Sequence, residues 1–61
     1  MYTVEQLIGI LPAGKLIRII DSSGESYAIA SCAAMVPWEI RRVRVLKNYV
    51  DGDDIFIVID I

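Results

Sequence analysis

The sequence predicts an α+β domain in which one short N-terminal helix lies on a four-stranded antiparallel sheet made of two hairpins. Three observations predict it. A helix cap and apolar residues at helical spacing open the chain, turn residues cluster around Gly24 and Gly52, and β-branched runs flank both turns. With 61 residues, the chain has room for a single domain, residues 1–61.

The helix is expected over residues 4–11. Thr3 and Gln6 have the spacing of a capping box, in which each side chain bonds the other residue's backbone N–H. Pro12 and Gly14 then end the helix. Its apolar stripe consists of Val4, Leu7, Ile8 and Leu11.

A β-hairpin is expected next, with strands over 15–20 and 26–32. Asp21 and Gly24 occupy the first and fourth positions that a type I turn favours. With Gly24 in the left-handed region, the connection is a three-residue loop with a bulge. The return strand carries a face of small residues on which the helix could lie: Ala28, Ala30 and Cys32.

A short helical turn is expected near 37–41, because Pro37 suits the first position of a helix. The alternating run 41–50 predicts a third strand, and 55–61 predicts a fourth. The fourth strand pairs with the third through an acidic turn that contains Gly52.

The register of this second hairpin follows from which residues must be buried. A loop with an odd number of residues, such as 51–53, sets Val45 against Ile59 and brings Arg44 opposite Asp60. A strict two-residue turn at Asp51–Gly52 would instead pair core residues with charged ones. Because a slip by one residue moves every side chain to the other face, we expect the odd loop.

The fourth strand is apolar on both faces. One face joins Val43, Val45, Ile55, Ile57 and Ile59 against the helix. The other carries an apolar centre, Leu46, Phe56 and Val58, within a rim of Arg42, Arg44, Asn48 and Asp60. Such a patch is typical of an interface and predicts a homo-oligomer, a dimer or a larger ring. The alternative is a small barrel whose first hairpin folds over this face.

Self-association would also supply stability that so short a chain lacks. For a domain of this size, the free energy gained by burial is nearly cancelled by the conformational entropy lost on folding. Cys32 is the single cysteine and there is no histidine, so neither an internal disulfide nor a zinc site is available.

The residues of common catalytic sites are missing, so we expect neither an enzyme nor a cofactor. The serines and Cys32 have no histidine to act as a base. The acidic cluster of Asp51, Asp53 and Asp54 lacks the spacing of a calcium loop and is explained by turn chemistry. No glycine-rich phosphate loop is present.

A basic stripe with aromatic residues is the candidate binding site for a ligand or partner. Its members are Trp38, Arg41, Arg42, Arg44, Lys47 and Tyr49. Cations and aromatic rings together could hold a phosphate-bearing ligand by charge and stacking. The alternative is an ordinary strand with solvated arginines and a core tryptophan. The net charge of −2 argues against general nucleic-acid binding.

No export signal and no apolar stretch of membrane-spanning length is found, so a cytoplasmic protein without a membrane partner is expected. The segments LPAGKLIRIID, VPWEI and DGDDIFIVI resemble short, uncharacterised accessory proteins encoded by phages and prophages of gut-type bacteria. The resemblance implies a homo-oligomer that antagonises host defence, by inhibiting a defence complex or sequestering a nucleotide signal. The alternative is a structural or assembly protein whose oligomer is itself the function.

Overall fold

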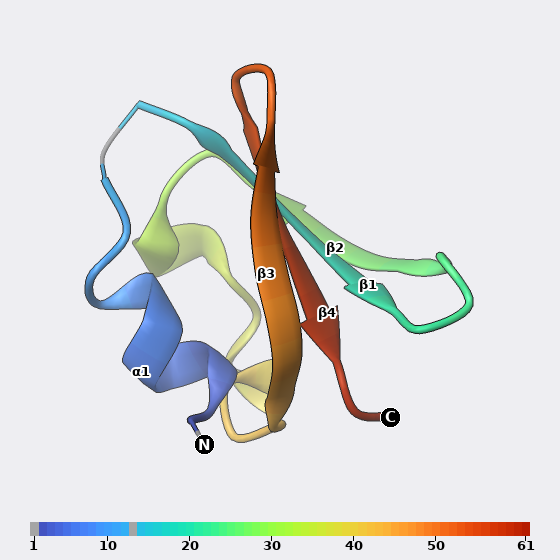
Figure 1. Cartoon of the computed structure of the whole chain (residues 1–61). Helices are drawn as coiled ribbons and strands as arrows, with labels where there is room; N and C mark the ends of the chain where they lie inside the picture. The colour runs from blue at the N-terminus through green and yellow to red at the C-terminus, as the bar shows by residue number, and fades with distance from the viewer. Residues whose placement is uncertain (1, 13) are drawn as a thin grey trace.

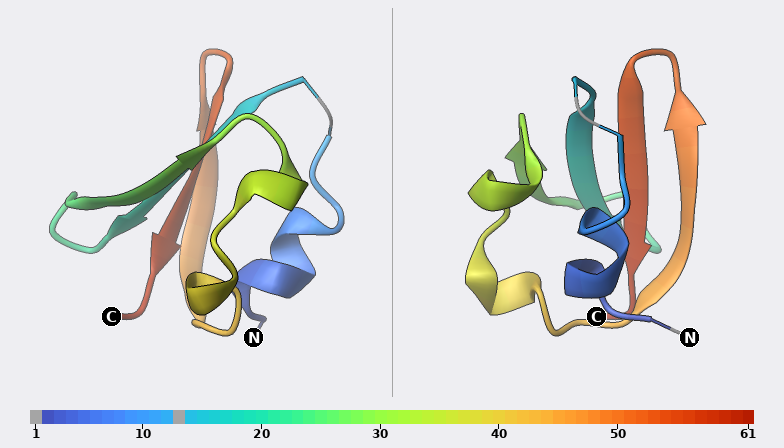
Figure 2. Two further views of the ribbon diagram at one scale, coloured as in Figure 1. Left: turned by 180° about the vertical axis from the view of Figure 1, so that it is seen from behind. Right: turned by 90° about the vertical axis from the view of Figure 1, so that its left-hand side faces the viewer.

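The computed structural model describes residues 2–12 and 14–61. Its elements are α1 (Val4–Ile8), β1 (Leu16–Asp21), β2 (Ser26–Ala30), the 3-10 turns η1 (Ala33–Met35) and η2 (Trp38–Ile40), β3 (Val45–Asp51) and β4 (Asp54–Ile59). The helix and the two 3-10 turns lie over one face of the sheet, here called the inner face (Figures 1 and 2). The predicted α+β class, with one short helix and four strands, is confirmed.

The sheet is mixed, and its strand order is β2-β1-β4-β3. β1 and β4 run parallel, whereas the two hairpin pairs are antiparallel. The prediction of an all-antiparallel sheet is therefore wrong, and the sheet does not close into a barrel. β4 lies between β1 and β3 (Figure 2), so side chains from both neighbouring strands flank its residues on each face. Its two apolar faces thus have an explanation within a single chain.

The capping box at the start of α1 is confirmed. The Thr3 N–H donates to Gln6 Oε1 at 3.0 Å, and the Gln6 N–H donates to Thr3 Oγ1 at 3.4 Å. The helix ends at Ile8 instead of residue 11, because Gly9 and the approaching Pro12 favour a tighter turn. In that turn the Ile10 N–H donates to the Leu7 carbonyl at 3.1 Å.

The first hairpin has the predicted loop. The Gly24 N–H donates to the Asp21 carbonyl and the Asp21 N–H to the Glu25 carbonyl, both at 3.0 Å. Gly24 has φ +91°, the left-handed conformation that glycine adopts without strain. β2 ends at Ala30, not at residue 32, because the chain turns there into η1. A bulge at Tyr27 shifts the register with β1.

The second hairpin corrects the predicted loop and the register next to it, but keeps the predicted pairing of Val45 with Ile59. Asp51 pairs with Asp54, which leaves a two-residue turn with Gly52 at φ +64°. A register shift between Val45 and Lys47 then brings Val45 opposite Ile59. The bulge at this shift supplies the extra residue that we had placed in the loop.

β3 begins at Val45, later than predicted, because 41–44 belong to the connection from η2. The Val43 N–H donates to the Ile40 carbonyl at 3.2 Å, and the Asp60 N–H donates to the Arg44 carbonyl at 2.9 Å. The second bond confirms that Arg44 lies opposite Asp60. The helical turn expected near 37–41 is present as η2.

The core lies between the inner face of the sheet and α1. Its most completely buried side chains are Val4, Ile19, Ile57 and Ile59. Ala30 is buried and Ala28 packs against the core, as the small-residue face predicted, but Cys32 is exposed. The predicted inner face is confirmed for Val45, Ile55, Ile57 and Ile59, with Val43 partly buried beside them.

Candidate functional site

The outer face of the sheet, opposite α1, carries the candidate site. Side chains directly opposite each other on paired strands point to the same face. The pairings place Arg18, Phe56 and Tyr49 in one row across β1, β4 and β3. They place Ile20, Val58 and Lys47 in the next row. The face therefore combines an apolar floor with cations from both neighbouring strands.

Phe56 lies at the centre of the first row. The Tyr49 ring stacks on it with centroids 5.1 Å apart and planes 4° apart, and the Arg18 guanidinium carbon lies 5.9 Å from its centroid. Arg18 Nε also donates to Asp54 Oδ2 at 2.8 Å. Arg18 is thus held by an ion pair, and its charge is balanced within the chain.

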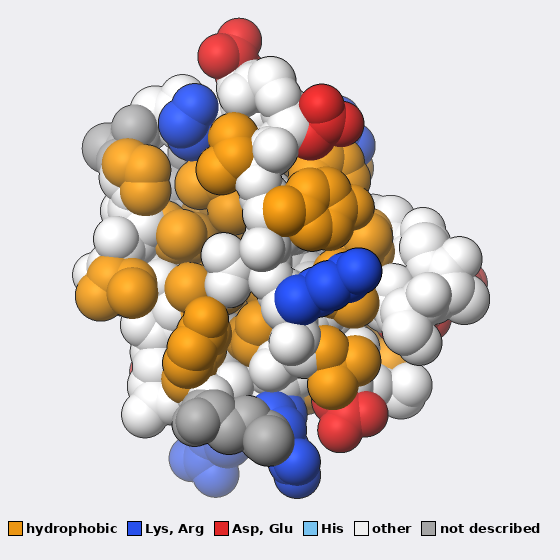
Figure 3. All heavy atoms as spheres, viewed as in Figure 1, with side chains coloured by type: hydrophobic (Ala, Val, Ile, Leu, Met, Phe, Trp, Pro, Cys, Tyr) orange, Lys and Arg blue, Asp and Glu red, His pale blue; other side chains and the backbone are white. Residues whose placement is uncertain are grey.

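A shallow groove of about 450 Å³ runs over the second row. The side chains of Ile20, Val58 and Leu46 form its apolar part, and Lys47 and Tyr49 border it from β3. The opposite wall is the first hairpin loop, Asp21 to Gly24. In the same view as Figure 1, Figure 3 shows hydrophobic side chains exposed on both sides of β3 and a basic side chain lying across them.

Asp21 fixes the conformation of this loop wall. Its Oδ1 accepts hydrogen bonds from the Ser23 hydroxyl at 2.6 Å, the Ser23 N–H at 2.9 Å and the Glu25 N–H at 3.0 Å. The Ser23 hydroxyl, followed by these backbone bonds, lowers the pKa of Asp21 below its ordinary value. The Tyr27 hydroxyl donates to Asp21 Oδ2 at 3.1 Å, and this bond raises the pKa of Tyr27. The carboxylate is therefore ionised at neutral pH and rigidly held.

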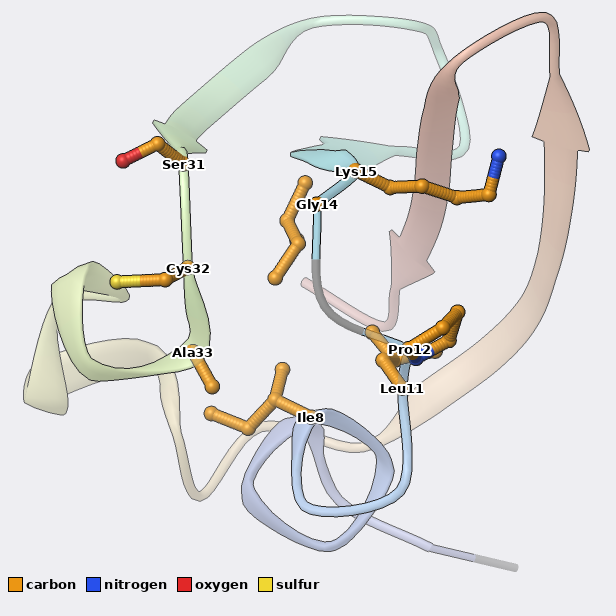
Figure 4. Close-up of a pocket in the computed structure, with 9 residues that line it drawn as sticks. Ile8, Leu11, Pro12, Gly14, Lys15, Ser31, Cys32 and Ala33 are labelled. Carbon is orange, nitrogen blue, oxygen red and sulfur yellow. The ribbon is translucent and has the colours of Figure 1, made fainter.

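A second, smaller cavity of about 170 Å³ lies between α1 and the start of β1 (Figure 4). Its walls include Ile8, Leu11 and Ala33. The side chains of Ser31 and Cys32 point away from it in the close-up. Among the described residues that line this cavity, Lys15 is the one charged residue, so we regard the outer groove as the better binding site.

The structure brings together part of each set of residues that the sequence singled out. Lys47 and Tyr49 from the basic stripe, and Leu46 and Val58 from the predicted interface, all line the groove. Val58 is 4% exposed and Leu46 is 53% exposed. Phe56 is half-buried at the border of the groove, beneath the ring of Tyr49. The chain thus covers part of its second apolar face by itself.

The rest of the basic stripe lies elsewhere. Trp38 is 66% exposed on η2, and the Arg42 guanidinium carbon lies 5.8 Å from its ring centroid. Arg41 turns toward its own chain, with Nε donating to the Val36 carbonyl at 3.1 Å and a terminal nitrogen to the Ala33 carbonyl at 2.9 Å. Arg44 lies just before β3, where its backbone forms an isolated antiparallel β-bridge with Thr3. The stripe is therefore not one surface.

The loop wall of the groove was missed by the sequence reasoning. Residues 21–24 belong to the first hairpin, and only the parallel pairing of Ile20 with Val58 brings them near β3. The two-sided apolar pattern of β4 was the signal that could have revealed this neighbour, because it is typical of a strand with partners on both sides.

Within residues 2–12 and 14–61, no group of three or more acidic or cysteine side chains is arranged to hold a metal ion. None of the helices in this part of the chain is long and apolar enough to cross a membrane. Comparisons with protein-family models, with curated proteins and with solved structures find no match. The outer groove is therefore the candidate functional site.

Proposed function

We propose that the chain is a non-catalytic binding protein, acting as a homo-oligomer, that holds a short segment of a partner protein in the outer groove. The observation that supports this most directly is the convergence of Lys47, an apolar floor and the hydrogen-bonded loop from Asp21 to Gly24 on one concavity. A concavity with an apolar floor and a few fixed polar groups is typical of a binding site.

The chemistry of the groove defines the segment that it fits. The floor of Ile20, Val58 and Leu46 accepts one apolar side chain. Lys47 on the β3 side favours an acidic neighbour. An apolar residue flanked by an acidic residue is therefore the expected recognition element.

The biological role that we propose for this binding is antagonism of a host-defence component by a phage-type accessory protein. Inhibition of a defence complex would use the groove. Sequestration of a nucleotide signal would use the Trp38–Arg42 pair instead, because an exposed ring beside a guanidinium can stack a base. Absorbance near 260 nm that co-purifies with the protein, and is lost in Trp38→Ala, would favour the nucleotide.

A structural or assembly role is the second candidate. The observation that favours it is the exposed edge of β3, where every residue after Val45 is exposed. An unpaired edge strand is a ready template for association with another chain. In this case the function would depend on the assembly formed through the β3 edge and not on the groove.

Selection of displayed random peptides against the immobilised protein tests the groove. We expect enriched peptides to carry an apolar residue beside an acidic one. Lys47→Glu should weaken their binding at least about tenfold and shift a fresh selection toward basic peptides, since like charges oppose each other across an interface. Arg42→Glu is the matched control and should leave binding unchanged. Peptides that bind Lys47→Glu and the wild type equally would exclude the groove as the site.

A further inference from the structure

We infer that β3 pairs edge to edge with β3 of a second copy, in antiparallel register about Tyr49, to form a continuous eight-stranded sheet. This deepens the homo-oligomeric part of the proposed function by naming the surface and the register. β3 lies at the edge of the sheet, with β4 on one side (Figure 2). Its seven residues run from Val45 to Asp51.

The covered part of this edge fixes where a second strand can lie. The Val45 N–H donates to the Tyr2 carbonyl at 2.9 Å, and Thr3 bridges Arg44. The N-terminal segment thus occupies the start of β3. Among the described residues, none pairs with the outer edge of Lys47–Asp51, and the centre of this segment is Tyr49.

The backbone of this segment is ready to accept a strand. In a two-residue hairpin, the closing pair exchanges both hydrogen bonds, and bonded and non-bonded pairs then alternate along the ladder. Asp51 and Asp54 close this hairpin, so Val50 and Asn48 point their N–H and C=O groups outward. A two-fold axis at Tyr49 places Asn48 of one copy opposite Val50 of the other, and each such pair exchanges both N–H···O bonds.

Charge selects this register. With Tyr49 opposite Tyr49 of the second copy, Lys47 lies opposite Asp51 of that copy, on the outer face. Asp51 otherwise faces Asp54, a like-charged cross-strand neighbour, and Arg18 already pairs with Asp54. A lysine from the second copy would offset this repulsion. Moving the axis to Asn48 would instead place Lys47 opposite Tyr49 and lose the ion pairs.

The aromatic rings support the same arrangement. Tyr49 already stacks on Phe56, so pairing about Tyr49 sets the tyrosines of both copies side by side between the two phenylalanines. Such cross-strand aromatic pairs stabilise a sheet. The other edge strand, β2, is less suited to this use, because the bulge at Tyr27 interrupts it.

The common protections of an edge strand are weak on β3. No proline lies in the strand, and its bulge lies at Leu46, next to the part that the N-terminus covers. Lys47 is its one basic residue, and in this register a carboxylate neutralises it. The two-fold axis is perpendicular to the sheet, so both outer grooves face the same side of the dimer.

Disulfide trapping tests the register. In a Cys32→Ser background, Tyr49→Cys should form a covalent dimer on mild oxidation, because Cα atoms of a non-bonded antiparallel pair lie about 4.5 Å apart. Lys47→Cys and Phe56→Cys are the matched controls and should form little dimer. Preferential trapping of Phe56→Cys would overturn the proposal in favour of stacked outer faces, and trapping of Lys47→Cys would overturn the register.

A charge swap tests the same pairing without new cysteines. Asp51→Lys alone and Lys47→Asp alone should each weaken dimerisation at least about tenfold in sedimentation equilibrium, and the double variant should restore it. An unaltered monomer up to about 1 mM would overturn the proposal. Peptide binding by the groove separates the two hypotheses. A monomeric wild type that still binds peptides would leave the groove proposal standing, whereas a trapped dimer without peptide binding would leave only the dimer.

Discussion

The ring of Tyr49 lies parallel to that of Phe56, with 5.1 Å between their centroids. This contact joins β3 to β4 on the face opposite the helix, where the pairing of Tyr49 with Phe56 makes the two side chains direct neighbours. It is also the point at which the apolar floor, the groove and the proposed dimer axis meet. The contact therefore bears on stability and on association alike.

The stacked pair should show measurable coupling. Tyr49→Leu and Phe56→Leu each keep an apolar side chain but remove the stacking, which is worth about 0.5–1.5 kcal/mol beyond burial. We expect a double-mutant cycle, measured by urea unfolding at a protein concentration that keeps every variant monomeric, to give a coupling energy in that range. Fully additive single effects would show that the rings contribute through burial alone.

Two glycines should respond in opposite directions to alanine. Gly24 has φ +91°, so Gly24→Ala should lower the free energy of unfolding by about 1 kcal/mol or more. Gly9 has φ −69°, and an added Cβ would lie 3.5 Å from the nearest atom, the Gln6 carbonyl oxygen. Gly9→Ala should therefore raise stability by about 0.4–1 kcal/mol, by restricting the unfolded chain. Thermal unfolding of both variants checks this, and equal shifts would contradict it.

Arg41 and Arg42 should separate into a structural and a surface residue. Arg41 donates to the Val36 and Ala33 carbonyls, so Arg41→Ala should destabilise the fold by about 1–2 kcal/mol. Arg42 is exposed beside Trp38, and Arg42→Ala should change stability by less than about 0.5 kcal/mol. Chemical unfolding of the two single variants measures both. A variant that carries both substitutions and binds more weakly than Arg42→Ala would then owe the difference to the lost Arg41 contacts.

Asp21 should make stability depend on pH in the acid range. Its pKa is lowered in the folded chain, so its contribution is complete above the ordinary aspartate pKa of about 3.9 and is lost as the pH falls through the folded value. The wild type should exceed Asp21→Asn in melting temperature at pH 7, and the difference should shrink below about pH 4. Asp53→Asn, in the other turn, is the control. A difference that does not change with pH would mean that Asp21 acts through geometry alone.

Much of the local structure could be predicted because its causes are local. The Thr3–Gln6 cap, the Asp21–Gly24 turn and the alternation of Ile55, Ile57 and Ile59 each depend on residues close in sequence. The strand order depends instead on which distant strands pair with each other, and the turn residues carry no information on that pairing. The pattern correctly predicts that Phe56 and Val58 form a second apolar face, but it leaves open whether a second chain or the first hairpin covers that face.

The groove was predicted in part for the same reason. Lys47 and Tyr49 are singled out by the local concentration of cations and aromatic rings, but strict alternation places them on the same face as Val43 and Val45. The bulge at Leu46 moves them to the outer face. Ser22 and Ser23, in the loop of the first hairpin, come close to Lys47 and Tyr49 only because β1 pairs in parallel with β4. Arg41 could not be distinguished from Arg42 in the sequence, because its structural role depends on two carbonyls that the 3-10 turn η1 and the residue after it place within reach of its guanidinium.

The position of β4 has a consequence for how the chain acquires its structure. β4 is the last strand along the chain, yet it lies between β1 and β3, and Ile17 must find Ile55 before the inner face exists. A hairpin such as β1–β2 can form within about 1–10 µs, but pairing between distant segments requires the slow closure of a long loop. The rate-limiting barrier should therefore lie at the insertion of β4. During synthesis on the ribosome, β1, β2 and β3 could not complete the sheet until β4 emerged.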